Sequence, residues 1–115
     1  MDLTPSAQSK RTEDIQDIAG LVVSDFNLEG KRDSLISNNF DEFREKLQDL
    51  INYLLYHDFE RLLNAMYRLD INEDKFRKAL ANQLSENMAR DLAELVIDRE
   101  MQKVLTRRKY RENNP

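Results

Sequence analysis

An amphipathic helical pattern over residues 40–56 constrains the fold more than any other feature of the sequence. Apolar side chains recur there at steps of three and four residues, and charged or polar side chains occupy the opposite face. The apolar set is Phe40, Phe43, Leu47, Leu50, Ile51, Leu54 and Leu55. Asn39 is placed to cap this helix, and Asp41 and Glu42 follow where the positive end of the helix dipole favours acids. The chain therefore contains a helix with a well-marked start.

Composition extends this helical prediction to the whole chain. Two glycines and two prolines among 115 residues leave little material for the tight turns of a sheet, whereas good helix formers are abundant. A chain of this length makes one domain. We predict an all-α fold, a compact four- or five-helix bundle with a long C-terminal helix. The predicted parts are a frayed segment over 1–12, in which Thr4-Pro5 is an acceptable alternative helix start, a domain over 13–110 made of 13–39 and 40–110, and a polar tail over 111–115.

The N-terminal part carries a weaker helical pattern. Apolar residues between Ile15 and Phe26 recur at helical spacing and predict a helix over 13–26, for which Thr12 is a suitable N-cap. Gly20 interrupts the pattern, and residues 21–23 could equally begin a short strand.

The segment over 27–39 is predicted to be a linker. It holds Gly30 together with serine and asparagine residues, a composition typical of loops. Leu35 and Ile36 are its apolar residues, and we expect them to attach the linker to the core.

The pair His57-Asp58 marks a change of phase in the apolar pattern. A tight junction between two helices, with Asp58 as the N-cap and Arg61 three residues later, is favoured over one kinked helix. The same pair resembles the metal dyad of HD-type phosphohydrolases, but that site needs further histidines, and the chain has only one. The junction is therefore the preferred interpretation.

Two further helices are predicted after Asp70. Asn72 is a good N-cap for a short helix that carries Phe76 and extends toward Leu84. The last helix starts at Ser85 or Asn87 and runs to about Lys109.

The last helix is longer than the helix over 40–56 by roughly 12 Å. The helix over 40–56, its expected packing partner, is therefore too short to cover Val104 and Leu105. We predict that a second copy covers them, which makes the protein a homodimer.

The residue inventory excludes most catalytic chemistry. Without cysteine there is no disulfide, thiol nucleophile, iron–sulfur cluster or cysteine zinc site, and one histidine cannot form a multi-histidine metal centre. No Glu-x-x-His repeat supports a di-iron site, and nearly all carboxylates fall on polar helix faces. We expect no cofactor, no metal and no enzymatic activity.

Two local clusters have structural interpretations. Arg68 and Asp70 are predicted to form a structural ion-pair site at a helix end, where Arg68 can bond the last carbonyls and pair with Glu94 or Asp98. A phosphate or ligand site is the alternative. The aromatic residues around the junction are assigned to the core rather than to a cofactor pocket. They are Tyr53, Tyr56, Phe59 and Tyr67.

The C-terminal end is basic although the chain carries a net charge of −4. Lys103, Arg107, Arg108, Lys109 and Arg111 exceed what a helix dipole requires. A solubilising tail is the first interpretation, docking of a protein partner the second, and contact with RNA or DNA the third.

Three segments between residues 50 and 110 carry a resemblance. They are 57–63, the Tyr-Arg-Leu-Asp segment at 66–71, and 96–103 with Thr106-Arg107. In the last of them, residues 99–107 read Arg-Glu-x-Gln-Lys-x-x-Thr-Arg. The chain resembles a group of uncharacterised small bacterial helical proteins with this pair of segments. The resemblance implies an all-helical fold and no assigned activity.

These observations favour a non-enzymatic interaction or regulatory module. Its predicted partner-binding residues are Val104, Leu105, Arg107, Arg108, Lys109 and Arg111, toward a second copy or an unidentified protein. A small nucleic-acid-associated protein is the alternative. The polar start of the sequence predicts neither a signal peptide nor a membrane span, and hence a cytoplasmic protein.

Overall fold

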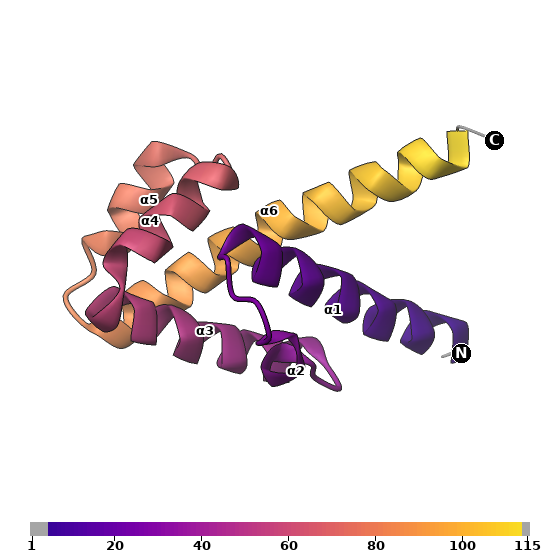
Figure 1. Cartoon of the computed structure of the whole chain (residues 1–115), viewed down its shortest axis with the longest axis horizontal. Helices are drawn as coiled ribbons and strands as arrows, with labels where there is room; N and C mark the ends of the chain where they lie inside the picture. The colour runs from indigo at the N-terminus through magenta and orange to yellow at the C-terminus, as the bar shows by residue number, and fades with distance from the viewer. Residues whose placement is uncertain (1–4, 114–115) are drawn as a thin grey trace.

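Six α-helices make up the chain over residues 5–113, the range described by a computed structural model, with side chains described over 12–112. The helices are α1 (Pro5–Asp25), α2 (Arg32–Leu35), α3 (Phe40–His57), α4 (Phe59–Arg68), α5 (Glu73–Leu80) and α6 (Ser85–Asn113). No strand occurs within this range, so the all-α prediction is confirmed (Figure 1). The one helix that the sequence did not predict is α2, a single turn within the segment that was predicted to be a linker.

Helix α6 is the element against which most of the others pack. Helices α3 and α5 contact its first half, and α1 packs on its second half in the opposite chain direction, with the two helices diverging toward the termini (Figure 1). Two side-chain contacts fix these alignments: Arg44 of α3 pairs with Glu94, and Asp17 of α1 pairs with Arg108. The bundle is therefore held together by its longest helix.

Helix α1 is longer than the sequence predicted. It begins at Pro5, which suits the first position of a helix because proline needs no hydrogen-bond acceptor there. The predicted start at residue 13 with Thr12 as the cap was wrong, and from Pro5 onward the segment expected to be frayed is helical. Residues 1–4 lie outside the described range. The alternative of a strand at 21–23 is also excluded, because α1 continues through Gly20.

Helix α1 covers part of the second half of α6, where Gln16, Asp17, Gly20 and Leu21 line the same hollow as Val104. Val104 is only 4% exposed and belongs to the core, although no second copy is present. The prediction that Val104 lacks a packing surface in the monomer was therefore wrong. The prediction compared the length of α6 with that of α3 alone, whereas α1 supplies the surface that covers Val104.

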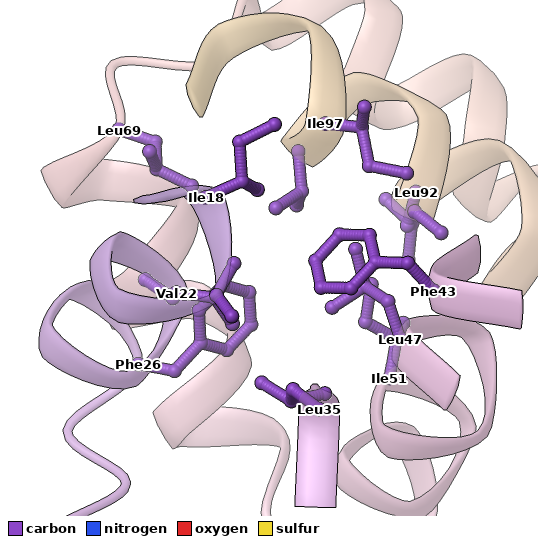
Figure 2. Packing of buried hydrophobic residues seen from close by; sticks show 14 of the residues in the cluster. Ile18, Val22, Phe26, Leu35, Phe43, Leu47, Ile51, Leu69, Leu92 and Ile97 are labelled. Atoms are coloured by element: carbon purple, nitrogen blue, oxygen red, sulfur yellow. The ribbon is translucent and has the colours of Figure 1, made fainter. Parts of the chain in front are cut away.

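The core lies where α1, α3, α4 and α6 converge (Figure 2). Phe26, directly after α1, and Phe43 of α3 are its largest fully buried side chains, with aliphatic residues of all four helices around them. Leu35 of α2 closes one end and is buried as predicted. Ile36 is 36% exposed, so the prediction that it also attaches the linker was wrong.

Three helices begin at side-chain caps that the sequence predicted. Asn39 accepts a hydrogen bond from the backbone N–H of Glu42, and Asn72 accepts one from Lys75. Asp58 accepts one from the backbone N–H of Arg61, so α3 ends and α4 begins at a tight junction. These caps satisfy N–H groups that a helix leaves without partners.

Two helices end in the same hydrogen-bonded motif. Asn27 and Asp70 both adopt a left-handed backbone, with φ of 57° and 56°. After α1, Leu28 N–H bonds to Val23 C=O, and after α4, Ile71 N–H bonds to Met66 C=O. This is the Schellman arrangement, in which the residue after the cap takes the left-handed conformation.

Candidate functional site

A wide groove lies between α3 and residues 27–35, which comprise the segment after α1 and helix α2. Its volume is about 1160 Å³, and it is open to solvent. Its apolar lining consists of Leu28, Leu35, Leu50 and Leu54. Because Leu28 is positioned by the C-terminal motif of α1 and Leu35 by α2, the shape of the groove depends on the segment predicted to be a linker.

Charged side chains of both signs surround this groove. Lys46 pairs with Glu42 and also donates to the backbone C=O of Ile36, which fixes α2 against α3. Glu29 and Asp49 line the groove and form no ion pair within the described part of the chain. The rim therefore presents two unpaired acids to a ligand.

The junction between α3 and α4 forms one end of the groove. The His57 ring lies against that of Tyr53, with centroids 4.6 Å apart. The Arg61 guanidinium donates to the Asp58 carboxylate at 2.9 Å, and this hydrogen bond lowers the pKa of Asp58. The pair His57-Asp58 thus has the structural role that the sequence favoured. Arg61 also donates to the backbone C=O of Asn27 at the end of α1.

The aromatic residues around this junction are on the surface. The assignment of all four to the core was wrong: Tyr53 is 58% exposed, Tyr67 is 87% exposed, and Tyr56 and Phe59 are also exposed. Tyr53 and Tyr56 lie beside the buried stripe of α3 rather than within it, and Tyr67 is one residue past the buried Met66. Helical spacing between two aromatics does not place them on the buried face.

A buried acidic cluster lies where α1 ends against α6. Glu100 of α6 is completely buried. Lys103 Nζ is 2.7 Å from Asp25 Oδ2 and 3.5 Å from Glu100 Oε1. One ammonium group therefore lies between two carboxyl groups.

The pKa of Glu100 is raised to about 8, first by burial and then by the neighbouring Asp25 carboxylate, while Lys103 opposes the rise. Glu100 is therefore largely protonated at neutral pH. Glu100 itself is closed off from solvent, whereas the side chains of Asp25 and Lys103 are 15% and 27% exposed. The protonation of Glu100 is therefore coupled to the contact between α1 and α6.

Glu100 is an unpredicted exception to the expectation that nearly all acids lie on polar helix faces. The signal was present, because Val96, Glu100 and Val104 follow at four-residue steps and the two valines are buried. A carboxylate at that position must enter the core.

The predicted partner-binding residues of α6 separate into two groups. Val104 is buried, and Arg108 is engaged inside the molecule, where its guanidinium lies 2.6 Å from Asp14 and 2.8 Å from Asp17. These hydrogen bonds raise the pKa of Arg108 further. The remaining four residues are exposed. They are Leu105, Arg107, Lys109 and Arg111.

The predicted ion-pair site at Arg68 and Asp70 has a different structure. Arg68 Nη1 donates to the backbone C=O of Asp25 at 2.9 Å, so it caps α1 rather than its own helix. Glu94, expected as a partner for Arg68, pairs instead with Arg44. Asp70 takes the left-handed position after α4, where Arg99 donates to the neighbouring Leu69 C=O.

The described side chains contain no group of three histidine, aspartate or glutamate residues arranged to hold a metal ion. None of the helices in this part of the chain combines the length and the apolar character needed to cross a bilayer. No family model matches the sequence, and neither a curated protein nor a solved structure shows significant similarity to it.

Proposed function

We propose that this protein is a non-enzymatic interaction module that binds an apolar segment of a partner protein in the groove between α3 and α2. The observation that carries the proposal is the groove itself, about 1160 Å³ in volume and floored by leucine side chains. Pockets for small molecules measure roughly 300–1000 Å³ and enclose their ligand. A larger and open groove with an apolar floor suits one face of an amphipathic helix.

The charges on the rim specify the chemistry of this partner. Glu29 and Asp49 carry no ion-pair partner among the described residues, whereas Lys46 and Arg61 are paired with acids. Lys31 is the remaining cation of the lining. With two unpaired acids and one unpaired cation among the described side chains, the net unpaired charge of the lining is negative. We therefore expect a partner helix whose apolar face is flanked by lysine or arginine.

A peptide that contains tryptophan provides a direct test, because the protein has none. The probe is an 18-residue amphipathic helix of leucine and lysine with one tryptophan, on the order of five turns long. Its fluorescence should shift on binding, and a Leu50→Asn, Tyr53→Ser double variant should bind it at least about tenfold more weakly.

The matched control is Tyr67→Ser, because Tyr67 is exposed on α4 and is not part of the groove. This variant should bind the probe as the unmodified protein does. A peptide in which glutamate replaces lysine should bind more weakly than the probe. Equal losses for the groove variant and the Tyr67 variant would contradict the proposal.

Self-association remains part of the proposal, but through another residue than Val104. Leu105 is 52% exposed on α6 and is suited to contact a second copy. We expect a dimer in light scattering, and a Leu105→Glu variant should be monomeric without loss of helicity. A monomeric mass for the unmodified chain at tens of micromolar would contradict this part of the proposal.

The nucleic-acid alternative has less support. Lys103 and Arg108, two of the five cations at the basic end, are bound to carboxylates of α1 and do not contribute free charge to a phosphate backbone.

A further inference from the structure

We propose that Arg32, Arg107 and Arg111 form a binding site for a phosphate-bearing small ligand on the face where α1, α2 and α6 meet. The three arginines line one hollow of about 260 Å³. Arg32 comes from α2 and the other two from α6, so the fold brings together residues 75 or more positions apart. The site is separate from the groove, and it does not depend on the proposed function.

The charge in this hollow is not balanced by the protein. Asp17 also lines it, but the Asp17 carboxylate is held by Arg108 at 2.8 Å. Asp14, the next acid along α1, is held by the same arginine. Arg32, Arg107 and Arg111 form no ion pair with a carboxylate in the described part of the chain. Three guanidinium groups without a carboxylate partner among the described residues thus share one concave surface of a protein whose net charge is −4.

Gly20 contributes to the shape of this site. The Cζ, Nη2 and Nε atoms of Arg32 lie 3.8, 3.9 and 4.0 Å from the point where a Cβ of Gly20 would be. These similar distances indicate that the guanidinium plane lies against the helix surface at Gly20. Nη2 reaches the backbone C=O of Gln16 at 3.4 Å, so Arg32 is anchored to α1 while its other N–H groups remain available.

The chemistry of the ligand follows from this geometry. Arginine is the side chain best suited to bind planar or tetrahedral oxyanions with two parallel N–H donors. Three such groups favour a ligand with more than one negative charge. A hollow of about 260 Å³ is smaller than the pockets that enclose whole drug-sized ligands, so it suits the phosphate end of a ligand rather than the entire molecule.

Calorimetry with inorganic pyrophosphate tests the site on the full chain. The unmodified protein should bind one pyrophosphate, and the Arg107→Gln, Arg111→Gln double variant should bind it at least about tenfold more weakly. The matched control is Lys75→Gln, Lys78→Gln, which removes from α5 two exposed cations that pair with no acid among the described residues. This control changes the net charge equally and should alter the affinity by less than about twofold.

A second variant separates the effect of the paired guanidinium N–H donors from the effect of charge. Arg107→Lys, Arg111→Lys keeps both charges but loses the paired donors, and it should still weaken binding by at least about threefold. All exposed substitutions should leave the thermal unfolding midpoint nearly unchanged, which shows that the variants are folded. A single-stranded oligonucleotide should not displace pyrophosphate at equal phosphate concentration. Equal losses in the α5 control, or tighter binding of the oligonucleotide, would overturn the proposal.

Discussion

Lys103 and Asp25 form an ion pair at 2.7 Å although they are 78 positions apart in the chain. The pair joins the end of α1 to the second half of α6 beside the buried Glu100. Arg68 approaches from α4 and donates to the backbone C=O of Asp25. Three helices thus meet around a small set of charges, and this set makes the stability of the contact dependent on pH.

Replacement of Glu100 by glutamine should remove most of this pH dependence. In the folded chain the pKa of Glu100 is about 8, compared with 4.5 for the free side chain. Below pH 4.5 the carboxyl group is protonated in both states and has no effect. Between these values unfolding releases a proton, so the free energy of unfolding falls as the pH rises, by a few kcal/mol in total. Above pH 8 the carboxyl group is deprotonated in both states, and the free energy of unfolding falls no further.

Urea unfolding at pH 5 and pH 8.5 measures this effect. The unmodified protein should be less stable at pH 8.5, and Glu100→Gln should lose much less stability between the two pH values. Glu86→Gln is the control, because Glu86 is exposed in the first turn of the same helix. The same pH dependence in the Glu100 variant and the unmodified chain would show that another group is responsible.

Replacement of Arg108 by glutamine should loosen the far end of the α1–α6 contact. Arg108 holds both Asp14 and Asp17, and its side chain is only 24% exposed. We expect a loss of about 1–2 kcal/mol, which lowers the unfolding midpoint by roughly 4–10 °C. Arg107→Gln is the neighbouring control, since Arg107 is exposed and forms no ion pair within the described range. A similar midpoint for both variants in a thermal scan would contradict this role.

Replacement of Asp70 by glycine should stabilise the protein, whereas alanine should destabilise it. Asp70 has φ of 56°, a backbone conformation that glycine adopts without strain and alanine does not. We expect glycine to exceed alanine by about 1 kcal/mol in the free energy of unfolding. Chemical denaturation of the two variants measures the difference, and equal stabilities would mean that the turn relaxes.

Replacement of Gly20 by alanine should stabilise helix α1 by up to about 1 kcal/mol. The added Cβ would have its nearest neighbour at 3.8 Å, an ordinary contact with Arg32 Cζ. A higher unfolding midpoint is therefore expected. A lower midpoint would show that Arg32 cannot adjust to the added methyl group.

The starts of three helices were predictable from the sequence, because each is marked by a capping side chain. Asn39, Asp58 and Asn72 each precede a helix and accept a hydrogen bond from the backbone three residues later. Such a cap needs no distant partner, so residue type and position are sufficient to find it.

Features that join distant segments were not predictable in the same way. Arg61 and Arg68 reach carbonyl groups at the end of α1, which lie 34 and 43 positions earlier. Their partners follow from how α1 and α4 pack together, and no local pattern contains this information. The groove has the same origin, because α2 is a single turn whose position is fixed by Leu35 and by the contact between Lys46 and Ile36.

The central position of α6 has a consequence for the order of folding. Helices α1 and α3 precede α6 in the chain, yet each packs more extensively on α6 than on the other. During synthesis, their apolar faces therefore stay without their main packing partner until α6 has left the ribosome. Because these contacts are distant in sequence, closing the chain precedes most of the gain from burial. The slow step in refolding is thus expected to be the docking of α6 rather than the formation of any single helix.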